Sequence, residues 1–306
     1  ENTSGPDSPW RNFLEYNLRV RRYLTENAFD IVHYNNILGF LLTRPALQAT
    51  TIPTVLHIRS KPRELTWYWK LSLLLTNRSI CVSDDVYDSI KGRIPTYYWP
   101  LIERKTVRIH NAVRFDEIQS YIESVKRKSV RSELGIADNE FAVGYVASID
   151  DRKNQLGFLQ DVVRKIHKSE KNIRFYFLGG SKNDKYKQRC TDYVSDHGLS
   201  DICSFEGYQK DIEKWYVGLD SVALYSLREG LPRAVLEAMA FGKPVITNAT
   251  TGVSEIITSG HDGFVHESPA PFANSIIELA DDKDKLCTTG ESAKEKKKKK
   301  FSISGL

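Results

Sequence analysis

Short apolar stretches alternate with longer amphipathic stretches through the second half of the chain, a pattern that is typical of a parallel α/β sheet. The apolar stretches predict strands at 141–147, 173–178, 202–205, 220–225 and 244–247. The stretches between them predict helices at 155–167, 185–197, 211–217 and 231–241, the third with Asp211 as its N-cap. Nearly unbroken apolar strands belong to sheets that are covered on both faces. Ligands of such doubly wound sheets lie at the carboxyl ends of the strands.

The first third shows the same alternation less regularly. It predicts a helix at 10–27 and strands at 29–33, 54–58, 78–82 and 106–109. A chain of 306 residues with 41% apolar content is long enough for two domains, each with its own core. The aromatic stretch 67–75 is expected to be a core helix, with a membrane anchor as the alternative.

Composition excludes several classes of protein. The sequence contains no run of 18 uncharged apolar residues, so we predict no membrane-spanning helix, and no signal peptide is visible. The four cysteines show neither metal-ligand spacing nor the density of a disulfide framework, so we expect buried free thiols in a reducing cytoplasm. The seven histidines form no HExxH-type cluster. We therefore predict a cytoplasmic protein with no structural metal and no cofactor.

The net charge of +5 is concentrated at the end of the chain. The segment Lys294–Lys300 carries six lysines and one glutamate, and the remainder of the chain sums to zero. Nucleic-acid binding would need basic residues spread over a folded face, so no nucleic-acid partner is expected. We predict that the lysine run is a solvated helix end; contact with a membrane surface or another polyanion is the alternative.

Two glutamates mark a candidate ligand site in the run 226–244. Glu229 stands at the lip of a turn, between a predicted strand and the predicted helix 231–241. Pro232 suits the first turn of a helix because its missing N–H is not needed there. The helix N-terminus then opens onto Glu229, Gly230 and Leu231, where free N–H groups and the helix dipole favour an anion such as a diphosphate.

Glu237 lies more than a turn inside that helix, among alanine, valine, leucine and methionine. An ionised carboxylate in such company needs a partner, and the two hydroxyls of a ribose would supply hydrogen bonds. The alternative is an ordinary surface ion pair with Arg233, four residues earlier on the same face, worth about 0.2–0.5 kcal/mol.

The run 226–246 resembles the signature S-x-x-E-G-x-P-x-x-x-x-E-A-M-A-x-G-x-P-V-I of the retaining family-4 glycosyltransferases, and the stretch 251–265 resembles the next element of that family. The resemblance implies an α/β GT-B fold of two Rossmann-like, doubly wound parallel-sheet domains facing across a cleft. It predicts an incomplete acceptor-side domain at 1–113, a connecting helix or linker at 114–139, a donor-binding domain at 140–290 and a lysine-rich tail at 291–306.

The turn 147–154 resembles the family's G-R-L-x-x-x-K-G/N turn, in which an arginine and a lysine contact the donor's diphosphate. Lys153 matches the lysine, whereas Ser148 stands where the arginine is common. The loss of one charge-assisted hydrogen bond costs about 1.5–3 kcal/mol, unless Arg152 substitutes for it. The turn at Tyr208 resembles the one that holds the nucleobase through backbone groups.

The predicted strands of the first third resemble the later strands of the family's acceptor domain. His57 occupies a position similar to that of a family histidine near the transferred sugar, where a neutral imidazole would bond a sugar hydroxyl; a packed strand-end histidine is the alternative. The family's opening strands have no counterpart here. The sequence therefore predicts a truncated chain that binds nucleotide but does not transfer sugar, with a bare apolar edge at 29–33 that favours self-association.

The function implied by the resemblance is metal-independent transfer of a sugar from a nucleotide diphosphate donor to a hydroxyl, with retention of anomeric configuration. Departure of the diphosphate from the front face is favoured over a covalent intermediate on Glu229. UDP-sugar is the first expectation for the donor and GDP-sugar the second. A cell-envelope or capsular saccharide, free or lipid-linked, is expected as acceptor, with peripheral contact at the inner face of the membrane. The alternatives are a non-catalytic nucleotide-sugar-binding relative and a GT-B UDP-GlcNAc epimerase.

Overall fold

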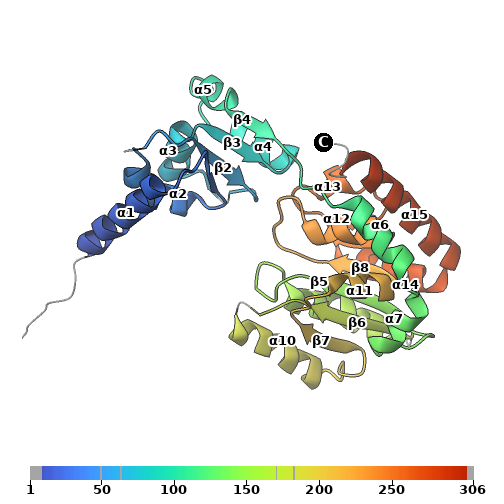
Figure 1. Ribbon diagram of the computed structural model, residues 1–306. Helices are drawn as coiled ribbons and strands as arrows, with labels where there is room; N and C mark the ends of the chain where they lie inside the picture. Colours follow the sequence, from blue (N-terminus) through green and yellow to red (C-terminus); the bar gives the residue numbers. More distant parts are fainter. Residues whose placement is uncertain (1–8, 49, 63, 170, 182, 302–306) are drawn as a thin grey trace, which may run out of the picture. The chain divides into compact units, whose positions relative to one another are not determined.

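The computed structural model describes residues 9–301 except 49, 63, 170 and 182, and it divides into two compact units (Figure 1). Unit 1 is Glu1–His110 and unit 2 is Asn111–Leu306. The division falls close to the expected end of the first domain at 113. The segment 114–139 and the lysine-rich helix both belong to unit 2. In the described part of the chain, no helix combines the length and apolarity needed to cross a bilayer.

Unit 1 is a four-stranded parallel sheet whose strands follow one another in chain order, β1-β2-β3-β4 (Figure 1). The strands are β1 (Val32–Tyr34), β2 (Thr54–Ile58), β3 (Arg78–Cys81) and β4 (Thr106–Arg108). The helices are α1 (Pro9–Glu26), α2 (Ile37–Gln48), α3 (Trp67–Leu75), α4 (Asp84–Lys91) and α5 (Trp99–Glu103). All four predicted strands are confirmed, although the first begins later than expected. Phe29 and Ile31 lie outside β1 and remain exposed beside the edge of the sheet.

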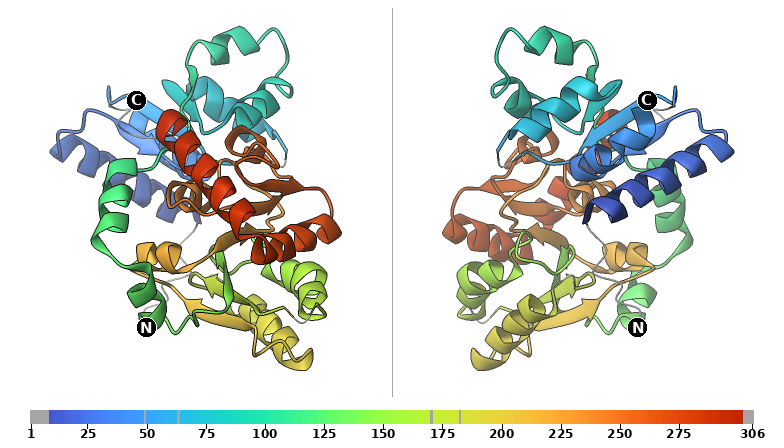
Figure 2. Two further views of the ribbon diagram at one scale, coloured as in Figure 1. Left: turned by 90° about the vertical axis from the view of Figure 1, so that its right-hand side faces the viewer. Right: turned by 90° about the vertical axis from the view of Figure 1, so that its left-hand side faces the viewer.

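Unit 2 is a six-stranded parallel sheet in the order β10-β9-β8-β5-β6-β7 (Figure 2). Its strands are β5 (Phe141–Val146), β6 (Ile173–Leu178), β7 (Cys203–Gly207), β8 (Ser221–Leu224), β9 (Val245–Asn248) and β10 (Phe264–His266). Its helices are α6 (Phe115–Ser124), α7 (Arg127–Glu133), α8 (Gln155–Phe158), α9 (Arg164–His167), α10 (Asp184–Asp196), α11 (Ile212–Gly218), α12 (Arg233–Ala240), α13 (Val253–Ile256), α14 (Pro269–Asp281) and α15 (Lys283–Lys300). A π-helical turn, η1 (Leu159–Val163), joins α8 to α9.

The order of the strands in unit 2 reverses between β5 and β8. After β5 the chain proceeds outward to β6 and β7, returns to β8 on the other side of β5, and then proceeds to β9 and β10. The connections that leave the carboxyl ends of β5 and β8 therefore run in opposite directions along the sheet. An open α/β sheet has its binding crevice at such a point.

The core of unit 2 is built around the fully buried ring of Phe158. The rings of Tyr145, Phe175 and Phe272 lie within 5.0–5.9 Å of it, centroid to centroid. Aromatic side chains bury a large apolar area each, so this cluster is the main hydrophobic anchor between the sheet and the helices that cover it. The π-helical turn keeps Leu159 and Val162 facing the same core.

Three local expectations need correction. The helix expected from about Leu231 begins at Arg233, because Pro232 has an extended ψ of 113° and is the N-cap residue. Asp211 stands at the N-cap of α11, but its side chain makes no capping hydrogen bond. The thiols of Cys81, Cys190 and Cys203 are buried and free as expected, whereas the thiol of Cys287 is free and exposed on α15.

The lysine run is not uniformly solvated, because Lys297 is 0% exposed. Its amino nitrogen lies 3.9 Å from the centroid of the Phe301 ring and has no hydrogen-bond partner among the described residues. Burial, reinforced by the neighbouring charge of Lys296, lowers the pKa of Lys297 to about 6. The Lys297 amine is therefore largely neutral at pH 7. Lys296 instead bonds the carboxylate of Asp262 at 2.7 Å.

Replacing Lys297 with methionine should raise the unfolding midpoint at pH 7. An unfolded lysine has a pKa of about 10.4, so between about pH 6 and pH 10 the folded protein binds fewer protons than the unfolded chain. Stability of the parent chain thus rises with pH over this window, whereas the variant lacks that dependence. Thermal unfolding should show a gap between the two proteins that shrinks as the pH approaches 10. Lys298→Met, on the exposed side of α15, serves as the control and should change little; a lower midpoint for Lys297→Met at pH 7 would contradict the argument.

Candidate functional site

The loops that follow β5 and β8 meet at the carboxyl edge of the sheet in unit 2. The hydroxyl of Tyr145, on β5, donates a hydrogen bond to the carbonyl of Lys153. The same hydroxyl accepts a hydrogen bond from the amide of Tyr225 at 3.0 Å, at the end of β8. The amide of Leu227 bonds the carbonyl of Arg152 at 2.9 Å. Backbone and side-chain bonds therefore hold the two loops together before any ligand is bound.

Glu229 lies at the centre of this junction and is only 5% exposed. The ammonium of Lys153 lies 2.6 Å from one of its carboxylate oxygens, and the guanidinium of Arg152 lies 3.5 Å from the other. A buried carboxylate needs such partners, because an unpaired buried charge is strongly destabilising. The structure thus brings together three of the predicted site residues, from the β5 loop and the β8 loop.

Gly230 and Leu231 follow Glu229 on the approach to α12. Among the described residues, the amides of Gly230 and Leu231 donate no hydrogen bond to another backbone group. Gly252 packs against this turn with a φ of 76°, and a Cβ there would lie 1.8 Å from the Gly230 carbonyl oxygen. Only glycine fits that position. The Asn111 side chain holds the turn from another direction by donating to the Leu231 carbonyl at 2.8 Å.

The loop after β5 also forms one wall of a cavity of about 580 Å³, which faces the ends of β6 and β7. Ser148 lies in this wall, and its hydroxyl donates to Asp150 at 2.7 Å. Gly179 closes the wall, since a Cβ there would lie 1.9 Å from the carbonyl oxygen of Ala147. Tyr208 borders the cavity and is 80% exposed. The cavity is therefore lined by all three carboxyl-terminal loops of β5, β6 and β7.

Glu237 lines a second cavity of about 540 Å³ in unit 2, between α6, α11 and α12. One carboxylate oxygen accepts from the Tyr216 hydroxyl at 3.1 Å and the other from Arg233 at 3.0 Å. Glu237 and Arg233 thus form the ion pair that the sequence analysis gave as the alternative. Burial raises the pKa of Glu237, and the bonds to Arg233 and Tyr216 oppose that shift. Glu237 is consequently a half-buried acceptor, not a fully solvated surface charge.

His57 belongs to unit 1, on β2 one residue before the end of the strand. Its ring stacks on His33 with centroids 5.3 Å apart, and its buried Nε2 atom has no hydrogen-bond partner among the described residues. Burial lowers the pKa of His57, and the neighbouring His33 and Arg59 lower it further. The imidazole is therefore neutral at pH 7.

Several polar groups near the site were not singled out from the sequence. Asn111 and Tyr216 bond the Leu231 carbonyl and the Glu237 carboxylate, as described above. The side-chain oxygens of Asn248, the last residue of β9, and of Thr250, in the turn that follows, are buried without a hydrogen-bond partner among the described residues. Buried polar atoms of this kind need a partner, so these two are further candidates for ligand contact. No sequence signal pointed to them, because each depends on contacts between distant positions.

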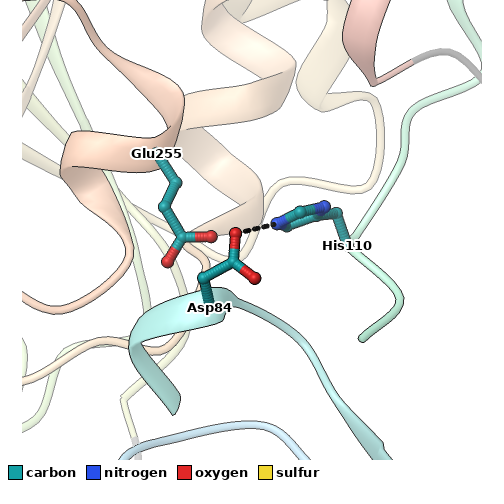
Figure 3. Close-up of side chains that lie close together, drawn as sticks. All are labelled: Asp84, His110 and Glu255. Atoms are coloured by element: carbon teal, nitrogen blue, oxygen red, sulfur yellow. Dashed lines mark ion pairs between the residues drawn. The ribbon is translucent and has the colours of Figure 1, made fainter. Parts of the chain in front are cut away.

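Asp84 and His110 lie side by side in unit 1, with a carboxylate oxygen of Asp84 4.0 Å from Nε2 of His110 (Figure 3). The other oxygen of Asp84 accepts from Arg108 at 2.9 Å. Metal sites generally need at least three protein ligands, and this part of unit 1 supplies two. We describe the group as an ion-pair cluster, and metal independence remains a prediction.

Residues 140–282 match the family described as "Glycosyl transferases group 1". The chain is 26% identical over 288 residues to UDP-Gal:alpha-D-GlcNAc-diphosphoundecaprenol alpha-1,3-galactosyltransferase of Escherichia coli, covering 87% of this chain and 70% of that protein. It is 25% identical over 308 residues to spore coat protein SA of Bacillus subtilis, covering 94% and 78%. The crystal structure of Anabaena HepE in complex with UDP-glucose superposes with a TM-score of 0.80 at 20% identity, covering 94% and 78%. The expected GT-B fold is thereby confirmed.

The buried pair of Lys153 and Glu229 should be strongly coupled in stability. Removal of either partner alone leaves the other poorly compensated, so Lys153→Met and Glu229→Gln are each expected to cost about 3 kcal/mol. The double variant should cost at least about 1 kcal/mol less than the sum of the singles, measured by denaturant unfolding as a double-mutant cycle.

The exposed pair of Lys128 and Asp138, 3.7 Å apart, provides the control cycle with Lys128→Met and Asp138→Asn. Its coupling should stay below about 0.5 kcal/mol, because solvent screens exposed pairs. Equal coupling in the two cycles would show that Glu229 is not held by Lys153 in solution.

Proposed function

We propose that this chain, whose residues 140–282 match the group 1 glycosyltransferases within a GT-B fold, has the site of an enzyme that transfers a sugar from a UDP-sugar to a hydroxyl acceptor, while the chain by itself is expected to bind the donor without transferring the sugar. The observation that carries the proposal is the cluster of Glu229, Lys153 and Arg152 at the point where the strand order reverses. The loop that carries Arg152 and Lys153 also contributes Ser148 to the cavity that Tyr208 borders. This is the edge of the sheet at which an open α/β fold binds a nucleotide.

Each residue has a specific task in this proposal. Lys153, Arg152 and the amides of Gly230 and Leu231 bind the diphosphate and stabilise the charge that develops on it as it leaves. Glu229 orients hydroxyls of the donor sugar, and Glu237 accepts hydrogen bonds from the ribose. The turn at Tyr208 holds the base. His57, as a neutral imidazole, bonds a hydroxyl of the transferred sugar.

The stereochemical course that we propose is retention through front-face departure of the diphosphate. Glu229 is already bonded to Lys153 and lies within reach of Arg152, which suits a residue that positions the donor better than one that attacks its anomeric carbon. No metal is needed in this scheme, since two cationic side chains and backbone amides are available for the diphosphate.

UDP is the favoured nucleotide because the similar structure of Anabaena HepE was solved with UDP-glucose and the similar Escherichia coli enzyme is named for UDP-Gal. The name of that enzyme also includes a diphosphoundecaprenol acceptor. We therefore propose a saccharide, free or lipid-linked, as acceptor and a role in cell-envelope or capsular polysaccharide synthesis.

Ser148 favours one rival, a relative that binds nucleotide sugar without transferring it. A second rival is an epimerase that acts on the donor alone. Incubation of the protein with UDP-sugar and water separates the three: slow release of UDP and free sugar supports a transferase, binding without release supports the non-catalytic relative, and conversion of UDP-GlcNAc to its epimer supports the third.

Glu237→Ala should weaken UDP binding at least tenfold in calorimetry. The loss of hydrogen bonds to a charged group costs about 1.5–3 kcal/mol, which corresponds to a factor of about 10–150. Glu123→Ala, an exposed carboxylate on α6, is the matched control and should leave the affinity unchanged. If Glu237→Ala binds UDP with unchanged affinity, Glu237 does not bind the ribose.

Arg152 should compensate for the missing arginine at position 148. Arg152→Ala is expected to lower UDP affinity and donor hydrolysis by about 10- to 100-fold, the value of one charge-assisted hydrogen bond. Ser148→Arg in the Arg152→Ala background should restore part of both. If Arg152→Ala has the UDP affinity and hydrolysis rate of the parent chain, Arg152 does not bind the diphosphate, and Lys153 is the cationic side chain of this loop that does.

A further inference from the structure

Asp150 lies in the turn that carries Lys153, and its carboxylate bonds both ends of that turn. One oxygen accepts a hydrogen bond from the Ser148 hydroxyl at 2.7 Å. The other accepts from the backbone amide of Lys153 at 3.0 Å. The carbonyl of Asp150 accepts from the amides of Lys153 and Asn154 at 3.0 and 3.2 Å. These four hydrogen bonds close the turn on itself.

The turn ends in a conformation that needs support from its surroundings. Asn154, the residue after Lys153, has a left-handed φ of 54° and directly precedes α8. Residues other than glycine adopt this region at a cost, although asparagine tolerates it better than most. Such a conformation persists where the surrounding contacts determine it, and the bond from the Asn154 amide to the Asp150 carbonyl is one of them. The turn therefore sets the path of the backbone through Lys153.

Both ends of Lys153 are held in place. Its ammonium lies 2.6 Å from Glu229, and its side chain is only 12% exposed. Its carbonyl accepts from the Tyr145 hydroxyl, and its amide donates to Asp150. A lysine side chain is long and flexible, so its ammonium occupies one place only when the backbone that carries it is fixed. The bond to Asp150 contributes to that fixation.

A carboxylate in this turn has an electrostatic cost in the proposed function, because the turn receives a diphosphate there and like charges repel. Asp151, the other acid of the turn, is exposed and accepts from the Asn183 side chain at 3.3 Å. Asp150 is half-buried and has an oxygen on each of its two partners in the turn. The cost is offset only if the order that Asp150 gives to Lys153 is worth more than the repulsion.

We propose that Asp150 is a positioning residue for Lys153 and that Ser148 serves the same purpose. The Ser148 hydroxyl holds the Asp150 carboxylate and does not bind the diphosphate. Asp150 fixes the turn, and the turn presents the Lys153 ammonium to Glu229 in the free protein and to the diphosphate in the complex. The inference rests on the proposed function, because it takes the diphosphate as the ligand of Lys153. Direct contact between Asp150 and the donor is the alternative.

The first test compares Asp150→Ala with Asp150→Asn by calorimetry with UDP. Alanine removes both side-chain acceptors and should weaken UDP binding about tenfold, the value of one or two net hydrogen bonds. Asparagine keeps an oxygen for the Lys153 amide and an amide group for the Ser148 oxygen, so it should bind UDP at least as tightly as the parent chain. In a Lys153→Met background, Asp150→Ala should cause less than about a twofold further loss, because it acts through Lys153.

The second test needs no nucleotide. The coupling between Lys153→Met and Glu229→Gln in denaturant unfolding should fall at least about twofold in the Asp150→Ala background, because the ammonium is then less well placed. Unchanged coupling would overturn the proposal. If the coupling falls but the parent chain does not bind UDP, the proposed function is wrong and the positioning of Lys153 by Asp150 stands.

Asp282→Ala is the matched control. The carboxylate of Asp282 also accepts from an amide three residues later, that of Lys285 at 2.9 Å, but at the start of α15. This control should lower the unfolding midpoint about as much as Asp150→Ala and leave UDP affinity unchanged. If Asp150→Ala likewise changes only the midpoint, its role is purely structural and the proposal fails. Losses that add to those of Lys153→Met, or an equal loss in Asp150→Asn, would also overturn it, by showing direct contact with the donor.

Discussion

The site depends on one constraint of chain topology, which is that β5 and β8 are neighbours although their connections run in opposite directions. The two loops leave a gap at the carboxyl ends of these strands that regular structure does not fill. Polar side chains occupy that gap, and Glu229 is the most deeply buried acid among them. Because the carboxylate is cut off from water, the cations of the other loop must accompany it.

The two glutamates of the signature consequently differ in electrostatic state. Glu229 is paired with a buried lysine and lies near an arginine, whereas Glu237 is half-buried, hydrogen-bonded to a tyrosine, and paired with an arginine that is largely exposed. In the proposed function, an arriving diphosphate competes with Glu229 for Lys153. Such a competition would link occupancy of the phosphate position to the freedom of the carboxylate to bond another group, which we propose is the donor sugar.

The sequence predicted those features that follow from local patterns. The strands of unit 2 are short apolar runs bounded by polar turns, so their positions could be found directly. The start of α12 could not, because proline favours the first turn of a helix, whereas the extended ψ of Pro232 makes it the N-cap here. Lys297 differs from its neighbours only in the direction of its side chain. Asn111 and Gly252 act through contacts with Leu231 and Gly230, which are distant in sequence and become visible only in three dimensions.

Tyr145 connects the two loops, because its hydroxyl donates to the carbonyl of Lys153 and accepts from the amide of Tyr225. Its ring is part of the aromatic core around Phe158, so the hydroxyl cannot retreat without disturbing that core. Both loops are thus hydrogen-bonded to the Tyr145 side chain and to each other. A displacement of the segment that carries Lys153 is therefore expected to displace the segment that carries Glu229. Phenylalanine at this position would keep the ring but lose both hydrogen bonds of the hydroxyl.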